Sequence, residues 1–471
     1  MNILLINPPR DNEVIGNNPI IIEKNRGVNP PLGILYVAAY IEKYSNHKIS
    51  VLDCQVESLN YEQLKNRIKK SNPDIVGLTA MSLTLLDVIQ TAKIVKETNK
   101  DIRVVLGGPH VHLFPEETIC LPNIDFLVLG EGEIVFMKLI DHIKDTDALE
   151  SIKGIVFKTE SKIVNTGLPE PIKQLDDLPF PARHLVPYKN YRSLLTKGQV
   201  VTTIFTSRGC PFKCSFCDRP HLGKKFRARS ALNVVEELQQ CKEMGISDFL
   251  FYDDTFTVNK QRVLDICNEV CKKKLDINWD IRTRVDTIDE EMIIHLKKAG
   301  CRSIHYGIEA GTEKILKILN KGITLEQAKK TFDLTRKHKM NILAYFMIGN
   351  PDESREDIYT TYKVMKKLKP DYVHITILTP FPGTKIYKDG LLSGIIKNDY
   401  WKAFAKKPSD DFNPLHINTL LSKSELNQLL RIGYKKFYLR PFYIFNQFLK
   451  VRSLTEFLKK MKAGLSVASM K

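Results

Sequence analysis

The sequence predicts an α/β protein that begins with a doubly wound parallel sheet, continues into a second α/β region and ends in a helical region. Three observations support this fold class. Short apolar runs alternate with amphipathic stretches over about the first 140 residues, and a second pattern of this kind runs from Val200 to about Tyr387. From Ser422 onward the pattern has a helical period and is rich in basic residues. Strands and helices that alternate at this rhythm are typical of parallel sheets.

The first region has five expected strands with amphipathic helices between them. The expected strands are Asn2–Asn7, Ile49–Asp53, Ile75–Thr79, Arg103–Gly107 and Phe126–Gly130. The expected helices include Leu32–Tyr44, Tyr61–Lys70 and Leu85–Thr98. Ligands of doubly wound sheets bind beyond the carboxyl ends of the strands, so the loops at those ends are the candidate binding sites.

Three of these loops carry glycines or small polar residues. The candidate residues are Ser82 and Leu83 after the third strand, Gly107 and Gly108 after the fourth, and Gly130 and Gly132 after the fifth. Glycines at strand ends allow a ligand to approach the backbone closely, and they also form tight turns between strand and helix. The residues alone leave both interpretations open.

A five-stranded unit with a Ser-x-Leu third loop and a Gly-Gly fourth loop resembles the cobalamin-binding domain. The resemblance covers residues 1–142 and implies that the nucleotide tail of cobalamin lies along these two loops. Many such domains also carry Asp-x-His-x-x-Gly after the first strand, and its histidine binds cobalt. Here the first loop, Arg10 to Gly16, has no histidine, and none precedes His47. If cobalamin binds, this loop supplies no lower ligand.

Residues 143–196 are expected to form a linker to the second region. A small hairpin is predicted at Gly154–Val164, where two apolar runs flank a polar turn. The stretch from Leu178 to Arg183 contains Pro179 and Pro181, which favours an extended chain along a surface.

Three of the nine cysteines are clustered, as Cys210, Cys214 and Cys217 in the pattern C-x3-C-x2-C. Thiolates are the usual ligands of iron–sulfur clusters, and three of them leave one iron of a 4Fe–4S cube open for chemistry. The alternatives are a chance grouping, or a zinc site completed by His221. The other cysteines occur singly and are expected to be small apolar core residues. They are Cys54, Cys120, Cys241, Cys267, Cys271 and Cys301.

The cysteine spacing resembles the defining motif of the radical S-adenosylmethionine (SAM) superfamily, which usually has an aromatic residue where this chain has Phe216. The resemblance implies that the amino and carboxylate groups of SAM bind the open iron. It also implies that residues 197–390 form a partial, TIM-like (β/α)6 barrel that is open on one side.

The later strands contain further residues that the resemblance places at SAM. Asp253 and Asp254 follow the expected strand Asp248–Tyr252, and the resemblance puts this position near the SAM amino group. A pair of helix-capping residues is the alternative. In the next strand Arg282 or Arg284, of which we select Arg284, could meet the SAM carboxylate, although a surface ion pair explains either one equally well.

The fourth strand of this region contains a Gly-x-Glu-x-Gly stretch centred on Glu309. By resemblance, this glutamate binds the ribose hydroxyls of SAM, and a carboxylate suits a vicinal diol because it accepts two hydrogen bonds. His305 and Tyr306 alternate in facing, so one of them is a candidate for the cavity lining, and packing is the alternative for both. No residue is assigned a catalytic proton or hydrogen transfer.

The basic charge is concentrated in the C-terminal region, residues 391–471. After Leu420 the chain has eleven basic residues and two acidic ones, which places +9 of the net charge of +17 there. Aromatic residues are interleaved with these lysines and arginines. Either the segment contacts an anionic membrane or a lipid-like substrate, or it forms a helical cap on the barrel with its aromatics inward. Because the rest of the chain is only mildly basic, nucleic-acid binding is not expected.

The N-terminus lacks the features of a signal peptide, and no run of eighteen apolar residues occurs. We therefore expect a cytoplasmic protein.

Taken together, the two resemblances imply a cobalamin-dependent radical SAM enzyme with a 4Fe–4S cluster, SAM and cobalamin. Its reaction would begin with a 5′-deoxyadenosyl radical made from SAM and would most simply end in methylation of an unactivated carbon. Oxidative cyclisation or rearrangement is the alternative, since the anaerobic magnesium-protoporphyrin IX monomethyl ester cyclase has a similar layout. A non-catalytic cobalamin sensor is a remote third reading. The expected partners are a small-molecule substrate, lipid- or tetrapyrrole-like, and an electron donor such as flavodoxin or ferredoxin.

Overall fold

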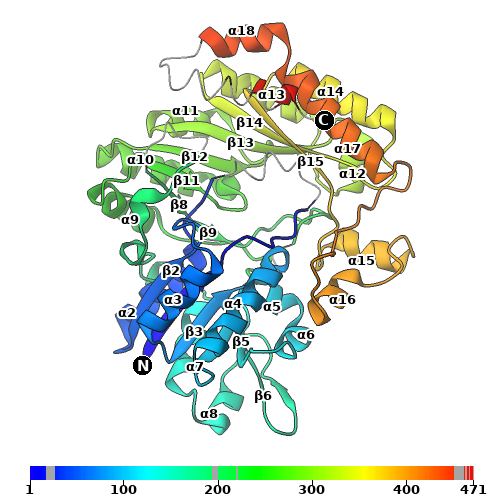
Figure 1. The fold of residues 1–471 in the computed structure, drawn as a ribbon. Helices are drawn as coiled ribbons and strands as arrows, with labels where there is room; N and C mark the ends of the chain where they lie inside the picture. Colours follow the sequence, from blue (N-terminus) through cyan, green and yellow to red (C-terminus); the bar gives the residue numbers. More distant parts are fainter. Residues whose placement is uncertain are drawn as a thin grey trace.

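The structure is a computed structural model that describes residues 1–16, 27–193, 200–218 and 221–449, with a few residues between 461 and 469. The remaining parts of the expected basic tail, including 450–460, lie outside the described residues. The chain is an α/β protein in which one sheet and its helices lie below a second sheet and its helices (Figure 1). Helices α17 (Lys423–Tyr438) and α18 (Pro441–Leu449) lie beside the second sheet, whereas α16 (Tyr400–Lys406) packs against α6 (Pro115–Ile119) of the first.

The first sheet has seven strands in the order β2-β1-β3-β4-β5-β6-β7. Its parallel strands are β1 (Asn2–Asn7), β2 (Lys48–Asp53), β3 (Ile75–Thr79), β4 (Arg103–Gly107) and β5 (Phe126–Val128). Its helices are α2 (Leu32–Tyr44), α3 (Tyr61–Ser71), α4 (Leu85–Thr98), α5 (Pro109–Leu113), α6 (Pro115–Ile119), α7 (Gly132–Asp141) and α8 (Thr146–Ser151). All five expected strands are present, with ends that differ by two residues or fewer.

The hairpin expected in the linker extends this first sheet. Its strands are β6 (Ile155–Lys158) and β7 (Ile163–Asn165), and β6 pairs antiparallel with β5. The pairing has a packing reason, because the ring of Phe157 lies 6.1 Å from that of Phe126, its partner in the register. The hairpin therefore packs with the N-terminal region.

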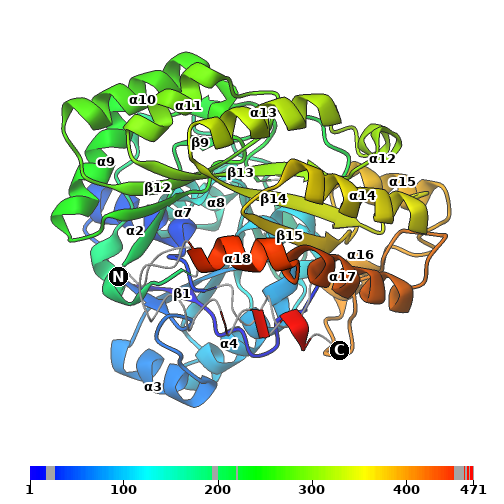
Figure 2. The same cartoon turned by 90° about the horizontal axis from the view of Figure 1, so that it is seen from above.

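The second sheet has six parallel strands in the order β15-β14-β13-β12-β11-β8. They are β8 (Val201–Ile204), β11 (Asp248–Phe251), β12 (Asn278–Thr283), β13 (Cys301–Glu309), β14 (Asn341–Ile348) and β15 (Tyr372–Ile377). The helices are α9 (Ala231–Glu243), α10 (Lys260–Lys272), α11 (Glu290–Lys298), α12 (Glu313–Ile318), α13 (Leu325–Lys337) and α14 (Arg355–Leu368). Viewed from above, these helices surround one face of a curved sheet (Figure 2). The expected six-unit parallel sheet is confirmed.

The side of this sheet that faces the helices forms a large hydrophobic core. Phe249, Phe251, Trp279, Tyr306 and Phe346 are all fully buried in it. Along each strand these residues alternate with ones that point to the opposite, concave face. The concave face is therefore free to carry polar side chains.

Short helices and linkers complete the fold. The 3-10 helices are η1 (Ser82–Thr84), η2 (Leu175–Asp177), η3 (Arg183–Leu185), η4 (Tyr188–Asn190) and η5 (Phe256–Val258). The C-terminal helices are α15 (Lys385–Leu392), α16 (Tyr400–Lys406), α17 (Lys423–Tyr438) and α18 (Pro441–Leu449). Among the described residues, no helix is long and apolar enough to cross a membrane.

Helix α17 covers the edge of the second sheet at β15. The Tyr434 hydroxyl accepts from the N–H of Ile375 at 3.0 Å and donates to its carbonyl at 2.9 Å. Tyr438 does the same with Val373, at 2.9 and 2.7 Å. Since an uncovered edge strand exposes unpaired backbone groups, these hydroxyls satisfy the edge in place of a further strand. For α17 the structure confirms the interpretation of a helical cap with inward aromatic residues.

Candidate active site

The cysteine loop begins at a two-stranded ladder at the carboxyl end of the second sheet. Strand β9 (Ser207–Arg208) pairs antiparallel with β10 (Arg227–Ala228), so the ladder closes the loop at its base. Gly209, the next residue, has a φ of +81°, and a Cβ there would lie 2.4 Å from the carbonyl oxygen of Lys225. Only glycine fits between the ladder and Cys210.

The loop is anchored to two other elements. The Ser215 N–H donates to the carbonyl of Leu319 at 2.9 Å, and the Ser215 carbonyl accepts from Ile386 at 2.8 Å. The Asn320 side chain donates to the carbonyl of Lys213 at 2.7 Å. These bonds fix the backbone between the first and last cysteines against the end of α12 and the start of α15.

The three thiols of the loop are reduced; Cys210 and Cys214 are half-buried and Cys217 is exposed. The Cys210 sulfur lies 3.8 Å from the Thr255 hydroxyl. The Cys214 sulfur accepts from Arg284 Nη1 at 3.5 Å. Burial raises the pKa of the Cys214 thiol, and the nearby Lys321 and Arg284 act in the opposite direction. A cation beside the sulfur favours the thiolate that a metal cluster requires.

Three thiols in one loop are the donors that a cubane cluster with one open iron uses. Among the described side chains, no three His, Cys, Asp or Glu residues converge as the ligands of one ion would. Each thiolate of a cubane binds a different iron, so its sulfurs surround the cluster instead of meeting at a point. Of the six single cysteines, Cys54, Cys241, Cys267 and Cys301 are buried, as expected for core residues. The expectation is wrong for Cys120, which is exposed, and Cys271 is half-buried.

Glu309 occupies a distorted position at the end of β13. Its φ is +74°, in the left-handed region that non-glycine residues rarely adopt, and the pairing register with β14 shifts between Gly307 and Glu309. Bulges of this kind turn a side chain away from the regular strand direction and are common next to active sites. The distorted backbone therefore sets the direction of the Glu309 side chain.

The side chain of Glu309 pairs with a lysine that the sequence did not single out. Its Oε1 accepts from Lys321 Nζ at 2.8 Å, and both side chains are more than nine-tenths buried. A Cβ at Gly307 would lie 2.4 Å from Glu309 Oε1 and 2.9 Å from Lys321 Nζ. The first glycine of the Gly-x-Glu-x-Gly stretch thus makes room for this ion pair. Lys321 also lies 5.7 Å from the ring centre of Phe216.

Arg284 connects the cysteine loop to the turn that carries Lys321. It forms a two-point ion pair with Asp286, with both distances 2.8 Å, and donates to the Lys321 carbonyl at 2.6 Å. Its guanidinium lies 4.0 Å from the ring centre of Phe212. Arg284, Phe216, Glu309 and Cys214 thus meet in one place, around Lys321.

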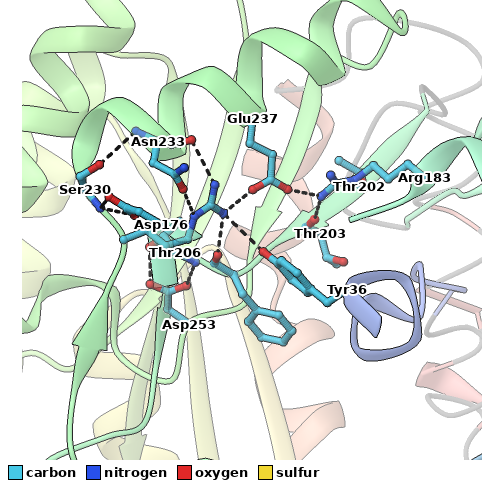
Figure 3. A network of polar contacts seen from close by, with 12 residues as sticks. Tyr36, Asp176, Arg183, Thr202, Thr203, Thr206, Ser230, Asn233, Glu237 and Asp253 are labelled. Atoms are coloured by element: carbon cyan, nitrogen blue, oxygen red, sulfur yellow. Dashed lines mark hydrogen bonds and ion pairs between the residues drawn. The ribbon is translucent and has the colours of Figure 1, made fainter. Parts of the chain in front are cut away.

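Asp253 is fully occupied with the turn that precedes the cysteine loop (Figure 3). Its carboxylate accepts from the Thr206 N–H at 2.7 Å, the Thr206 hydroxyl at 2.5 Å and the Ser207 hydroxyl at 2.6 Å. These contacts give Asp253 a structural role between β8 and β9. A contact of Asp253 or of the adjacent, half-buried Asp254 with SAM stays a prediction.

In the first domain, the loops after the third and fourth strands are joined to each other. The Ser82 hydroxyl lies 3.0 Å from His110 Nδ1, and the Ala80 N–H donates to the carbonyl of Gly107 at 2.7 Å. Gly108 has a φ of +102°, and a Cβ there would lie 2.8 Å from the Ala80 carbonyl oxygen. Gly108 is therefore required by the turn itself.

Two further observations concern these joined loops, which form a platform with Ser82, Leu83, Gly107 and Gly108. The carbonyl of Leu83 accepts from the N–H of Val14 at 2.8 Å, which ties the first loop to the third. His110 is completely buried, its Nε2 has no hydrogen-bond partner among the described residues, and burial lowers its pKa to about 3. A buried polar atom without a partner, beside the Ser82 hydroxyl, fits a site that is completed by a bound polar group.

The fifth loop faces the cysteine loop through its acidic residues, which are not among the residues predicted from the sequence. Arg208 contacts Glu131 at 2.6 Å and Glu133 at 2.5 Å, and Arg227 contacts Glu131 at 2.6 Å. All four side chains are at least nine-tenths buried. Burial alone would raise the pKa of Glu131, but Arg208 and Arg227 hold it below its ordinary value. The two glutamates of the Gly-Glu-Gly-Glu stretch are the sequence feature that could have indicated these contacts.

The glycines of this fifth loop are used in packing. Gly130 has a φ of +71°, and a Cβ there would lie 2.8 Å from Pro169. A Cβ at Gly132 would lie 3.2 Å from Val37. Their expected contact with cobalamin stays a prediction.

A second buried ion network lies where the linker meets α9 (Figure 3). Glu237 pairs with Arg183 at 2.6 Å and also with Arg229, and all three side chains are almost completely buried. Arg229 also donates to the hydroxyl of Tyr36, on α2 of the first domain, at 3.4 Å. Burial would raise the pKa of Glu237, but its two arginines lower it below the ordinary value.

Known protein families match both halves of the chain. The B12 binding domain model matches residues 19–140 and the Radical SAM superfamily model matches residues 204–365. The chain is 35% identical to an uncharacterized methyltransferase of Pyrococcus horikoshii, over 94% of this chain and 93% of that protein. It is 27% identical to the anaerobic magnesium-protoporphyrin IX monomethyl ester cyclase of Rubrivivax gelatinosus, over 91% and 77% of the two chains.

Solved structures share the fold. The cobalamin-dependent SAM radical enzyme OxsB, with aqua-cobalamin and SAM bound, superposes with a TM-score of 0.73 at 19% identity, covering 98% of this chain and 70% of that one. The families and the fold agree with the two resemblances noted in the sequence. The chain therefore belongs to the B12-binding radical SAM superfamily, related to its methyltransferases and to the anaerobic cyclase, and its cofactors are a 4Fe–4S cluster, SAM and cobalamin.

Proposed function

We propose that this enzyme methylates an unactivated carbon of a small molecule. The observation that carries the proposal is the contact of Arg208, two residues before Cys210, with Glu131 and Glu133 of the first domain. A reaction that uses two cofactors needs both held at a fixed separation, because positioning contributes much of an enzymatic rate. The relative in Pyrococcus horikoshii is named a methyltransferase, which supports methylation over other outcomes.

The described residues have separate tasks around these cofactors. When bound, SAM and the reduced cluster supply a 5′-deoxyadenosyl radical that removes hydrogen from carbon, and cobalamin supplies the methyl group. Cys210, Cys214 and Cys217 would hold the cluster, and Arg284 and Lys321 place positive charge beside it. We assign Glu309 to the ribose hydroxyls of SAM, since Lys321 is its sole hydrogen-bond partner among the described side chains and a carboxylate accepts further bonds.

Cobalamin is assigned to the carboxyl end of the first sheet. The platform of Ser82, Leu83, Gly107 and Gly108 offers a hydroxyl and backbone that a large ligand can approach closely. At Gly107 a Cβ would be in ordinary van der Waals contact with the Val128 carbonyl oxygen at 3.8 Å, so the turn does not require a glycine there. The first loop supplies no histidine to cobalt.

Oxidative cyclisation is the second candidate, and the similarity to the anaerobic cyclase favours it. The two reactions differ in whether the methyl group of SAM is transferred. A cobalamin sensor without catalysis is the least supported candidate, because the three cysteines and Glu309 are all present and placed together.

The cluster is tested first. Full-length protein reconstituted anaerobically with iron and sulfide should show the absorbance and dithionite-reduced EPR signal of a 4Fe–4S cluster. Cys214→Ala should lose most of that signal. Cys271→Ala is the matched control, because Cys271 lies on α10 outside the loop, and it should keep the signal. A colourless protein that holds one zinc ion would overturn the assignment of the cysteines.

Methylation is tested without knowledge of the substrate. The enzyme reconstituted with cobalamin should transfer a deuterated methyl group from SAM to the cofactor, detected by mass spectrometry of the extracted cobalamin. Retention of cobalamin with no methyl transfer would favour the cyclase-like reaction. If no cobalamin is retained, the methylation proposal fails, while the cluster result stands on its own.

Two partners are part of the proposal. An electron donor of the flavodoxin or ferredoxin type is needed to reduce the cluster. The second partner is an anionic membrane surface at α18, which has no charged residue and exposes Phe442 (76%), Phe445 (59%) and Leu449 (65%), directly after the cation Arg440. Exposed apolar residues next to basic ones are typical of interfacial helices. Sedimentation with anionic vesicles, and not with zwitterionic ones, should be reduced in Phe442→Ser; equal sedimentation would exclude this contact.

A further inference from the structure

The concave face of the second sheet carries a continuous group of aromatic, histidine and arginine side chains. In the pairing register Arg282 of β12 lies opposite His305 of β13, and Tyr345 of β14 lies opposite His374 of β15. Tyr252 directly follows β11, the strand next to β12. These residues alternate with the ones that build the hydrophobic core on the other face.

Solvent reaches this face. On β15 the residues of one face are fully buried, whereas His374 and its neighbours on the other face are half-buried. Arg282, Tyr345 and Tyr252 are half-buried in the same way. A sheet face packed against protein would show no such alternation, so side chains on this face can meet a ligand.

The side chains of the concave face contact one another. The guanidinium of Arg282 lies 3.9 Å from the ring centre of Tyr252. The Tyr345 hydroxyl lies 3.3 Å from His305 Nδ1, and its ring stands edge-on to that of His374, with centres 5.7 Å apart. Burial raises the pKa of Tyr345, which keeps its hydroxyl protonated and able to donate.

The group is joined to the first domain. The Asn29 side chain donates to the Tyr252 hydroxyl at 2.9 Å. One end of this group of side chains therefore touches the domain that binds cobalamin. The strand that holds His305 ends at Glu309, the proposed SAM ligand. A molecule bound here lies between the two cofactor sites.

Arg282 has no carboxylate partner among the described residues, in contrast to its neighbours. Arg284 has Asp286 at 2.8 Å, and Asp280 on the same face lies near His305 at 3.8 Å and Arg302 at 4.0 Å. The Nε atom of Arg282 is buried without a hydrogen-bond partner in the described part of the chain. Because Arg282 is only half-buried, its guanidinium is accessible and can pair with an anion that reaches this face.

We propose that this concave face binds the anionic group of the substrate, a carboxylate or a phosphate-type group, with Arg282 as its main partner and His305, Tyr345 and His374 as further polar contacts. The planar fork of arginine matches such groups with two parallel hydrogen bonds. A pure hydrocarbon would offer Arg282 no partner and is disfavoured as substrate. The proposal rests on the proposed function, because the radical formed beside Glu309 acts only on a neighbouring molecule.

The test uses small aromatic probes of one shape and different charge. Benzylphosphonate, phenylacetate and the neutral 2-phenylethanol are titrated calorimetrically into full-length enzyme carrying its cluster. At least one anion should bind roughly tenfold or more tightly than the neutral probe, and the stronger anion identifies the class of group. Equal binding of all three would overturn the proposal.

Variants assign the effect to Arg282. Arg282→Gln should weaken binding of the preferred anion roughly tenfold, Arg282→Lys less, and Tyr345→Phe by a few fold. Arg67→Gln is the control, since that exposed arginine lies on α3 of the first domain and pairs with Glu57. Each variant is accepted only with an unchanged cluster spectrum and unfolding midpoint.

Binding of S-adenosylhomocysteine separates a substrate site from a SAM site. In Arg282→Gln the affinity for S-adenosylhomocysteine should stay within about threefold of the parent value. S-adenosylhomocysteine should also not compete with the anion for binding. Competition, or loss of S-adenosylhomocysteine affinity alone, would show that Arg282 serves SAM and would overturn the proposal. These measurements need neither cobalamin nor methyl transfer, so they remain decisive if the methylation proposal fails.

Discussion

The two buried ion networks of this enzyme use the same chemistry in different places. In one network Glu237 lies between Arg183 and Arg229, where the linker meets helix α9 (Figure 3). In the other, Glu131 and Glu133 hold Arg208 and Arg227. In both, carboxylates pair with arginines out of contact with water.

The difference is what each network joins. The Glu237 network links the segment after the first domain to the first helix of the barrel, and Arg229 extends it to Tyr36 of the first domain. The Arg208 network links α7 of the first domain to the ladder that closes the cysteine loop. A buried ion pair adds little net stability compared with an apolar pair, but it tolerates few alternative geometries. We infer that Glu237 maintains the fold, whereas Arg208 sets the separation of the two cofactors.

The largest effect is expected at Glu237. Glu237→Gln leaves two buried arginines without a counter-charge and should lower the free energy of unfolding by about 3–5 kcal/mol. Urea denaturation of the anaerobic protein measures this loss. The adjacent Glu236→Gln is the matched control, because Glu236 is exposed on the same helix and should change stability by less than about 0.5 kcal/mol. A loss below about 1 kcal/mol at Glu237 would show that water or rearrangement compensates for the missing charge.

A smaller loss of stability with a larger change in cofactor geometry is expected at Glu133. In Glu133→Gln, Arg208 keeps its contact with Glu131, so the free energy of unfolding should fall by only about 1–3 kcal/mol. The distance between the reduced cluster and paramagnetic cobalamin, measured by pulsed EPR, should shift or broaden. Glu236→Gln should leave this distance unchanged. An unaltered distance in Glu133→Gln would refute the separation-setting role.

The elements that sequence predicted well are those specified by local pattern. Helices Leu32–Tyr44 and Leu85–Thr98 have the expected bounds, since their apolar periodicity is uninterrupted. Ser230 caps α9 and accepts from the N–H of Asn233, a role that serine favours at a helix start. The cysteine spacing and the Gly-x-Glu-x-Gly stretch are also short motifs, so the sequence alone predicts their candidate roles.

The contacts that sequence missed depend on distant parts of the chain. Lys321 reaches Glu309 from a turn, and nothing local distinguishes it from the many other lysines. Arg208 finds its partners 75 and 77 residues earlier. The role of Asp253 in holding the Thr206 turn likewise depends on the pairing of β8 with β11. Only tertiary structure decides which of several possible partners a charged group obtains.

Glu353, a buried carboxylate with no arginine partner among the described residues, can be compared with Glu237 through the pH dependence of stability. Glu353 is fully buried in the turn after β14 and accepts from the N–H and the side chain of Asn350, both at 3.0 Å. Burial raises its pKa from 4.5 to about 7. The pKa of Glu237, which is just as buried, is instead lowered by its two arginines. The presence or absence of a cationic partner, and not burial itself, therefore decides whether the pKa of the buried carboxyl rises or falls.

The two carboxylates should act on opposite sides of the stability profile. Glu353 binds its proton more tightly in the folded state, so its contribution falls as pH rises from about 4.5 to about 7. Glu237 contributes fully above its ordinary pKa, and that contribution is lost as pH falls below it. We therefore expect urea unfolding across this range to show two results for Glu353→Gln. The decline of the free energy of unfolding toward neutral pH should disappear, and the loss of stability in acid should remain. A profile identical to that of the parent enzyme would mean that Glu353 ionises normally, and that burial without a cationic partner is not what separates the two sites.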